Sequence, residues 1–381
     1  MEGKESAPIK VRAANTVASF LLFAMSATGC NLNFPGSSSE DSQELLNRST
    51  PVDPELGKRY RQIIEESVGQ DCELPEVGFR SIKRPTVFLP RFRTEGYMIP
   101  PSNDGETANI IIPTLSKRDP IVAQSAKEAG VTREEYKKAM ENVTIIHEGI
   151  HLCSPFETSD QKHPNPVIVD YTKPDVQRDR RGVYKLNYQV RRLEIAPFSG
   201  LGLMIEESKI YSDGTVEIHK LYQEEGDTEE LITHSITPQR VLKKYGADSL
   251  EYKASQESGY PTGRTVLTNI FATKEVGFDD IIGAKQKNDA KAIFEMVKQG
   301  VEEIGKRAGI ERKVTDENHS NFVLYNFFSQ LSTERAAKNE INPNLLIDYL
   351  SNYFFGKNFN KTTAKEREQM ISVYNQVFIK R

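Results

Sequence analysis

Several features that mark particular classes of protein are missing from this chain of 381 residues. It has no basic tract and its net charge of -4 is small, so nothing in its charge indicates a nucleic-acid partner. Only three cysteines occur, which allows at most one disulfide within the chain. No internal repeat is visible. What remains is a composition of 37% hydrophobic and 27% charged residues, typical of a soluble globular body with two domains or one large domain and an appendage.

The N-terminal segment joins a positive start to a short apolar run. Two lysines and an arginine precede a mostly apolar stretch from Ala13 to Met25, and the segment ends at Ala27-Thr28-Gly29-Cys30. The run is shorter than the about 20 residues of a membrane-spanning helix. The pattern resembles a bacterial lipoprotein signal, which implies a signal peptide over residues 1–29 and a membrane anchor through lipid on Cys30. An ordinary cleavable signal or an uncleaved anchor is the alternative, and all three place the remaining chain outside the cytoplasm.

The segment after Cys30 is polar and rich in Ser, Gly and Pro, and it has no apolar periodicity. It predicts a flexible tether over residues 30–54. A helix is then expected over about 54–68 and, between 76 and 115, strands at 86–89, 96–99 and 109–112.

The most informative stretch is His147-Glu148-Gly149-Ile150-His151. Residues four apart share one face of a helix, so the two imidazoles can bind one metal ion. Glu148 lies about 100° round the helix, where its carboxylate can reach a water on that metal. Upstream, Thr132-Arg133-Glu134-Glu135 predicts the capping box that begins this helix. The alternative is that the two histidines are buried structural residues or surface residues.

At these residues the chain resembles the zincin superfamily of zinc metallopeptidases, strongly over 132–152 and more weakly from about 95 to 210. The resemblance implies an α+β fold, with a small mixed or antiparallel sheet and an active-site helix. It also implies Zn²⁺ as cofactor and hydrolysis of peptide bonds in a peptide or protein substrate. The strand at 109–112 would be the sheet edge that holds the substrate, and a simple buried strand is the alternative. Residues 55–283 would form this domain, and residues 284–381 a helical C-terminal subdomain.

A catalytic zinc site has three protein ligands and an open position, so the two histidines need a third ligand. The gluzincin branch of the superfamily places a glutamate on a second helix downstream, and residues 200–211 fit such a helix. Glu207 is favoured over Glu206, because its neighbours three and four residues away are all apolar or aromatic. A carboxylate on an apolar face is costly unless it is paired or binds a metal.

Other assignments stay open. If Ser212-Asp213-Gly214-Thr215 is the turn of a hairpin, Glu206 and Glu207 are strand residues. Glu157 has the spacing of the metzincin branch but lacks the glycine of that branch. The acidic run from Glu225 to Glu230 superficially matches a ligand motif, but no apolar turn precedes it, and a solvated charge run is favoured. The remaining candidate ligands are His163, His219 and His234.

With zinc held by His147, His151 and Glu207, Glu148 would act as general base toward a water activated by zinc. A second donor to the developing oxyanion is expected from among Tyr211, His219, His234, Tyr252 and Tyr260. Two functions remain open: a lipid-anchored extracytoplasmic zinc endopeptidase, or a non-catalytic surface lipoprotein that uses a zincin-like scaffold for binding.

Downstream of the motif, Ser154-Pro155 must end the helix, and residues 154–181 are expected to form a loop. A strand is expected over 182–190, and helices are expected at about 264–274, 284–306, 318–340, 342–354 and 362–378. Cys72 and Cys153 form one disulfide if the compartment is oxidising, or they are two buried thiols. A bond would pin the end of the helix that carries His151.

Overall fold

The computed structural model describes residues 39–69, 72–83, 97–99, 107–114, 120–153, 167–178, 184–198, 202–210, 216–222, 227–256, 261–287, 289–336 and 341–378. Between 167 and 229 it describes the backbone alone. The expected signal peptide and lipidated Cys30 therefore lie outside the described residues, as does the strand expected at 86–89.

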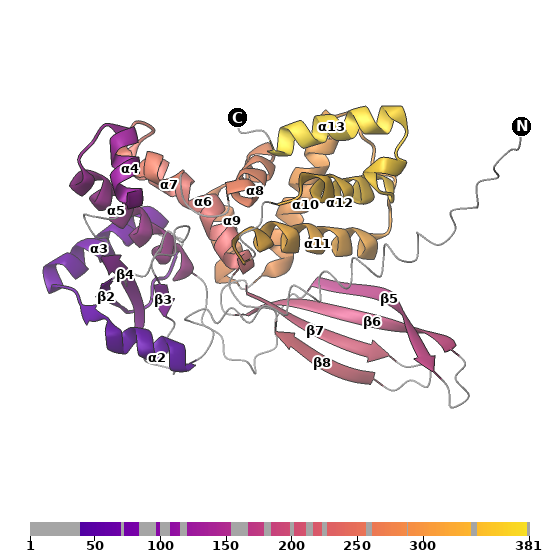
Figure 1. Cartoon of the computed structure of the whole chain (residues 1–381), viewed down its shortest axis with the longest axis horizontal. Helices are drawn as coiled ribbons and strands as arrows, with labels where there is room; N and C mark the ends of the chain where they lie inside the picture. Colours follow the sequence, from indigo (N-terminus) through magenta and orange to yellow (C-terminus); the bar gives the residue numbers. More distant parts are fainter. Residues whose placement is uncertain are drawn as a thin grey trace, which may run out of the picture.

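The first sheet is small and mixed (Figure 1). Its order is β1 (Thr50–Pro51), β2 (Val77–Lys83), β4 (Ala108–Thr114) and β3 (Tyr97–Ile99). β2 and β4 run parallel, whereas β1 and β3 pair antiparallel with their neighbours. The strand expected at 109–112 exists, but its assignment as the sheet edge is wrong, because β3 lies outside it. The run Ile110-Ile111-Ile112 in β4 is buried on both faces, as a central strand requires.

The segment expected to be a tether is folded where the structure describes it. Residues 39–48 form α2 (Ser39–Arg48), and β1 follows. Leu45 packs with Ile82, Ile99 and Ile111 in a small apolar cluster. The guanidinium of Arg80 donates to the Leu46 carbonyl at 3.1 Å. The prediction of a flexible chain through residue 54 is therefore wrong from Ser39 onward, because apolar residues within the polar stretch reach the sheet.

The expected motif helix is confirmed as α5 (Arg133–His151), and the expected helix before the sheet as α3 (Pro54–Val68). The capping box is present, with Thr132 Oγ1 accepting from Glu135 N and the Glu135 carboxylate accepting from Thr132 N. α5 packs closely on α3 at Gly149. A Cβ on Gly149 would lie 2.7 Å from Cγ2 of Ile64, so the glycine of the motif permits this contact.

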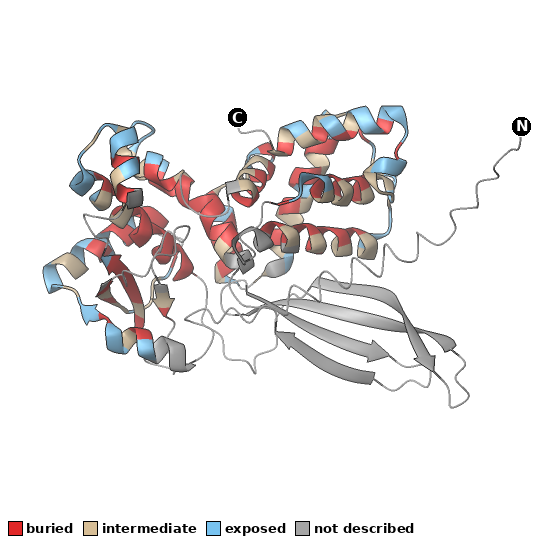
Figure 2. Cartoon of the chain, viewed as in Figure 1, coloured by how far each residue is buried: buried red, intermediate tan, exposed pale blue. Residues whose placement is uncertain are grey.

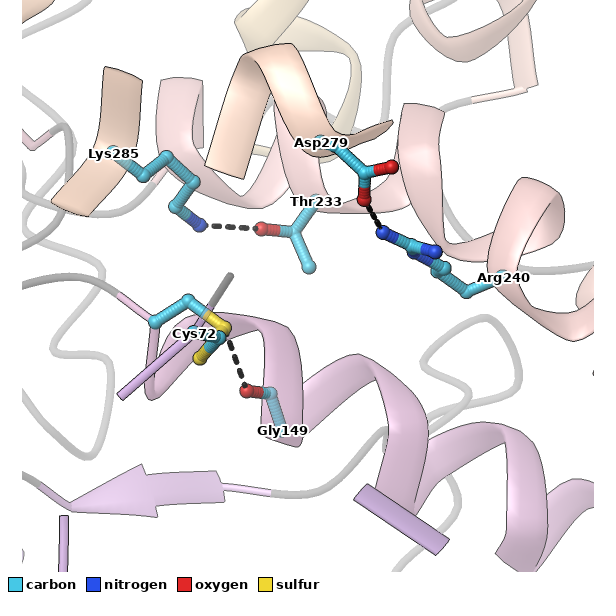
Figure 3. The surroundings of a disulfide bond; sticks show 7 residues. Cys72, Gly149, Thr233, Arg240, Asp279 and Lys285 are labelled. Atoms are coloured by element: carbon cyan, nitrogen blue, oxygen red, sulfur yellow. Dashed lines mark hydrogen bonds and ion pairs between the residues drawn. A yellow bond between two sulfur atoms is a disulfide. The ribbon is translucent and has the colours of Figure 1, made fainter. Parts of the chain in front are cut away.

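Cys72 and Cys153 form a disulfide, which settles the alternative left open by the sequence. The bond lies just beyond the C-terminal end of α5, where the Cys153 sulfur is 3.7 Å from the Gly149 carbonyl oxygen (Figure 3). The chain segment before β2 is thereby tied to the end of the motif helix.

A second sheet follows α5 and is an antiparallel meander of four strands. In order they are β5 (Val167–Arg178), β6 (Tyr184–Phe198), β7 (Gly202–Ile210) and β8 (Val216–Tyr222). The strand expected at 182–190 is confirmed as part of β6, and the loop expected over 154–181 is wrong for β5. The helix expected at 200–211 is also wrong, because this stretch is β7 and pairs with β8 in the hairpin alternative. A short apolar run satisfies helical and strand spacing alike, and here strand pairing decides.

The rest of the described chain is helical. It comprises α4 (Pro120–Ala129) before α5 and then α6 (Asp227–Tyr245), α7 (Leu250–Ser255), α8 (Pro261–Thr273), α9 (Phe278–Gln286), α10 (Ala290–Arg307), α11 (Glu317–Ala336), α12 (Pro343–Phe355) and α13 (Ala364–Phe378). The helices expected after residue 264 are confirmed with shifted bounds, except that 284–306 is divided between α9 and α10.

One hydrophobic core joins α3 and α5 to the later helices up to Val377 in α13 (Figure 2). The expected boundary at residue 284 therefore does not separate two cores. The change from mixed sheet to helices instead occurs at α6, which runs between the part around the first sheet and the C-terminal helices (Figure 1). Among the described helices, none is long and apolar enough to cross a membrane. The fold is thus α+β and mostly helical, with a small mixed sheet of four strands.

Candidate metal centre

The two motif histidines lie side by side on the buried face of α5. Nε2 of His147 and Nε2 of His151 are 3.1 Å apart, and both side chains are buried. This is the arrangement expected from residues one helical turn apart, and it directs the same ring nitrogen of each residue to one point.

A carboxylate from α6 lies beside both histidines. Oε2 of Glu230 lies 3.3 Å from Nε2 of His147, and Oε1 of the same carboxylate lies 3.6 Å from Nε2 of His151. The Glu230 side chain is 26% exposed, so this side of the site faces solvent. A helix downstream of the motif, α6, thus brings a carboxylate beside the two histidines, whereas Gly202–Ile210 is the strand β7.

A third histidine joins the group from one turn further along α6. Nε2 of His234 lies 3.6 Å from Oε2 of Glu230, and its ring centroid is 4.5 Å from that of His147. One ligand atom from each of His147, Glu230 and His234 lies within 4.8 Å of the others. Both helices thus bring a pair of metal-binding side chains at a spacing of four residues.

The hydroxyl of Thr237 favours one tautomer of His147. It donates to the Thr233 carbonyl at 2.7 Å, so it is available to His147 Nδ1, 3.3 Å away, only as an acceptor. His147 then carries its proton on Nδ1, which leaves the lone pair of Nε2 directed at Glu230 and His151. Metal-binding histidines normally donate their second N–H in this way.

The spacing of these atoms fits a metal ion. Four ligands at Zn–N distances of about 2.0–2.1 Å around a tetrahedral ion lie about 3.3 Å from one another. The separations among the ligand atoms of His147, His151 and Glu230 run from 3.1 to 3.6 Å. Two imidazoles and a carboxylate suit zinc and also other divalent transition metals, so the geometry does not select one metal. The donor set therefore fits the expected cofactor without being specific to it.

Glu148 is buried on α5 next to His147. Its burial places the carboxylate within the protein rather than in solvent. A carboxylate kept in such surroundings is costly unless its neighbours compensate for the charge.

The local structure of α6 keeps Glu230, His234 and Thr237 in place. Pro238 lies inside this helix and has no N–H to donate to the His234 carbonyl. The hydroxyl of Thr268 in α8 donates to the next carbonyl, that of Ser235, at 3.3 Å. The fully buried Lys285 of α9 donates to another residue of α6, at Oγ1 of Thr233, at 3.3 Å (Figure 3). These contacts attach the ligand-bearing turns of α6 to α8 and α9.

The structure removes one argument for the expected third ligand. Glu207 lies in β7, opposite His219 in β8, so the argument from an apolar helix face no longer supports it. The side chains of the rival candidates lie outside the described residues; these are Glu157, His163, Glu206, Glu207, His219 and Glu225. Of the expected oxyanion donors, Tyr211 and Tyr260 also lie outside the described residues. Tyr252 lies in α7 and packs against the core. His234 lies beside Glu230.

The sequence contains a signal for Glu230, although its acidic neighbours favour a solvated charge run. Glu230 and His234 are four residues apart, like the motif histidines, and apolar residues at Leu231, Ile232 and Ile236 surround them. Pro238 and the acidic start of the stretch hide this helical pattern.

Comparison of the chain with protein-family models, with curated proteins and with solved structures finds no match.

Proposed function

We propose that this protein is a lipid-anchored, extracytoplasmic zinc-dependent endopeptidase with a zincin-like catalytic domain. The observation that carries the proposal is the convergence of Nε2 of His147, Nε2 of His151 and the Glu230 carboxylate at the spacing of metal ligands. Glu148 follows His147 on the same buried helix, as the motif requires of a general base. In this proposal Glu230 replaces Glu207 as the third ligand.

Different residues of the chain have different roles in this proposal. His147, His151 and Glu230 would hold the ion, and Thr237 orients His147 through its Nδ1–H. When bound, zinc supplies Lewis acidity for the attack of water on a peptide carbonyl. Glu148 accepts the proton of the attacking water and returns it to the leaving amine. The extended substrate pairs with β3, one of the two edge strands of the first sheet.

Two observations support a location outside the cytoplasm. The N-terminal sequence has the lipoprotein pattern that ends at Cys30. The buried Cys72–Cys153 disulfide is typical of proteins that fold in an oxidising compartment. A Cys30→Ser variant is expected to leave the membrane fraction, and retention in that fraction would contradict the lipid anchor.

The test measures metal content and hydrolysis of a mixture of unstructured peptides by the purified full chain. We expect about one zinc per chain, as a single catalytic site requires, and cleavage within the peptides rather than at their ends. His147→Ala should lose the metal. Glu148→Gln should keep the metal and lose hydrolysis. Glu134→Gln is the matched control, because it removes an exposed carboxylate at the other end of α5.

The outcomes separate the two functions. A chain that neither contains zinc nor takes it up on titration would contradict the peptidase. A chain that binds zinc through His147, but hydrolyses no peptide, would support the alternative of a non-catalytic surface lipoprotein with a metal-stabilised scaffold. Equal activity of the wild type and Glu148→Gln would exclude Glu148 as the base.

A further inference from the structure

The N-terminal helix α2 and the motif helix α5 lie on opposite faces of the first sheet. In β4, Ile110 and Ile112 belong to the main core, which also contains residues of α3 and α5. Ile111, between them, packs instead with Leu45 of α2. Successive residues of a strand point to opposite faces, so the sheet separates the two helices (Figure 1). The candidate metal centre lies beyond α5, where that helix meets α6.

Polar contacts also hold α2 on the sheet. Arg80 of β2 donates to Ser49 Oγ at 2.7 Å and to the carbonyl oxygens of Leu46 and Ser49 at 3.1 and 2.9 Å. A guanidinium at the last carbonyls of a helix stabilises its C-terminal end. The chain then enters β1, which pairs with β2. Because α2 begins at Ser39, the chain belongs to the folded body from that residue onward.

Little chain separates this docked helix from the proposed lipid anchor. Ser39 is nine residues after Cys30. Even a fully extended chain spans only about 3.6 Å per residue, so α2 begins within about 30 Å of the membrane surface. The successive layers α2, sheet and α5 are about 10 Å apart, which places the metal centre no more than about 60 Å from the membrane. Without the docking of α2, the free chain would run to Asp53, the N-cap of α3, and would span up to about 80 Å by itself.

We propose that the docking of α2 restricts this peptidase to polypeptide segments next to the membrane that carries its own lipid. Its substrates are then the juxtamembrane segments of proteins held in the same membrane. The inference rests on the proposed function, both the anchor at Cys30 and the peptidase, and adds the substrate class to it. A chain free up to α3 would instead let the metal centre reach parts of other proteins far from the membrane.

The experiment places the lipidated full chain and its substrate on one supported planar bilayer. The substrate is an unstructured peptide carried by a membrane-spanning helix, either at the surface or on a helical spacer of about 60 residues, which holds it about 90 Å away. The wild type should cleave the near peptide and leave the far peptide intact. A Gly-Ser insertion of about 60 residues before Ser39, with an average span of about 45 Å, should allow cleavage of both.

The same insertion after Arg381 is the matched control, because it adds equal mass without lengthening the tether. A second variant, Leu45→Asp, places a charge in the apolar contact of α2 with the sheet. It should free the chain up to Asp53 and permit slow cleavage of the far peptide. Glu44→Gln changes an exposed residue of the same helix and should not. All variants should cleave a soluble peptide at the rate of the wild type.

Cleavage of the near and far peptides at similar rates by the wild type would overturn the proposal, and so would an insertion before Ser39 that leaves the far peptide intact. In both cases the anchored peptidase of the proposed function survives. A wild type that cleaves the soluble peptide but not the near peptide would also overturn it. By contrast, a wild type that cleaves no peptide, in solution or on the bilayer, contradicts the proposed function together with this inference.

Discussion

The hydroxyl oxygen of Thr237 on α6 lies 3.3 Å from Nδ1 of His147 on α5. This contact joins the two helices that carry the candidate ligands. It also fixes the ring nitrogen through which His147 can bind a metal, because the Thr237 proton is directed at the Thr233 carbonyl.

Removal of this hydroxyl should weaken the metal site. Thr237→Val keeps the shape of the side chain and leaves the Nδ1–H of His147 without its acceptor. We expect a loss of metal affinity of about 10- to 100-fold, measured by competition with a chelator, and near-normal affinity in Thr237→Ser. Thr273→Val is the control, because its buried hydroxyl bonds only within α8, to the Asn269 carbonyl. An equal loss of affinity in the control would mean that general destabilisation, rather than the contact with His147, is responsible.

The third ligand can be tested directly by comparing two glutamates. Glu230→Gln should abolish stoichiometric metal binding, because this carboxylate lies 3.3 Å and 3.6 Å from the two ring nitrogens. Glu207→Gln, in β7, should leave metal content unchanged. Metal analysis after exhaustive dialysis distinguishes them, and a loss of metal in Glu207→Gln alone would restore the ligand set expected from the sequence.

Gly149 in the motif allows α5 to pack closely on α3, whereas the neighbouring motif residues are candidates for metal binding and catalysis. In Gly149→Ala the added methyl meets Ile64 at 2.7 Å, so we expect the free energy of unfolding to fall by about 1–3 kcal/mol. Gly283→Ala, where no atom lies within 4 Å of the added methyl, should instead raise it by up to about 1 kcal/mol. Urea denaturation measures both. Ile64→Ala should partly rescue Gly149→Ala, and the absence of any rescue would place the strain elsewhere.

Stability of the C-terminal helices should depend on pH through Glu366. Hydrogen bonds from Lys313 and Lys357 hold the pKa of the Glu366 carboxyl far below its usual value. A group with a lowered pKa in the folded state stabilises the protein above its unfolded pKa of about 4.3 and loses this effect as the pH falls below it. Glu366→Gln should therefore be less stable than the wild type at pH 7, and the difference should shrink under acid. Glu368→Gln, an exposed neighbour in α13, should show no such pH dependence.

Local signals predicted local structure well. The capping box at Thr132 and the apolar spacing along the following residues predicted α5, and with it the approach of His147 to His151. The possible pairing of Cys72 with Cys153 was also visible, although nothing in the sequence decided it.

The errors concern contacts between distant parts of the chain. Glu207 has apolar neighbours at helical spacing, yet β7 gains hydrogen bonds from two adjacent strands that the spacing does not reveal. The edge of the first sheet was assigned to β4 because strand order depends on long-range pairing. α6 was missed because Pro238 and the acidic residues before Leu231 resemble a loop, and the packing on α8 and α9 that stabilises this helix is not encoded locally.

The helix α5 is linked to an earlier part of the chain and to a later part. The disulfide joins its end to a residue 81 positions earlier, and His147 meets a carboxylate 83 positions later. An ion at this site would act as a second cross-link and close a loop about as long as the covalent one, with the whole second sheet inside it. The entropy of closing a loop changes slowly with its length. The hairpins β5–β8 could therefore be lengthened or shortened with little loss of stability at the metal centre. Withdrawal of the ion would open only the later loop, so α6 should become the first part of the molecule to lose its protection against hydrogen exchange.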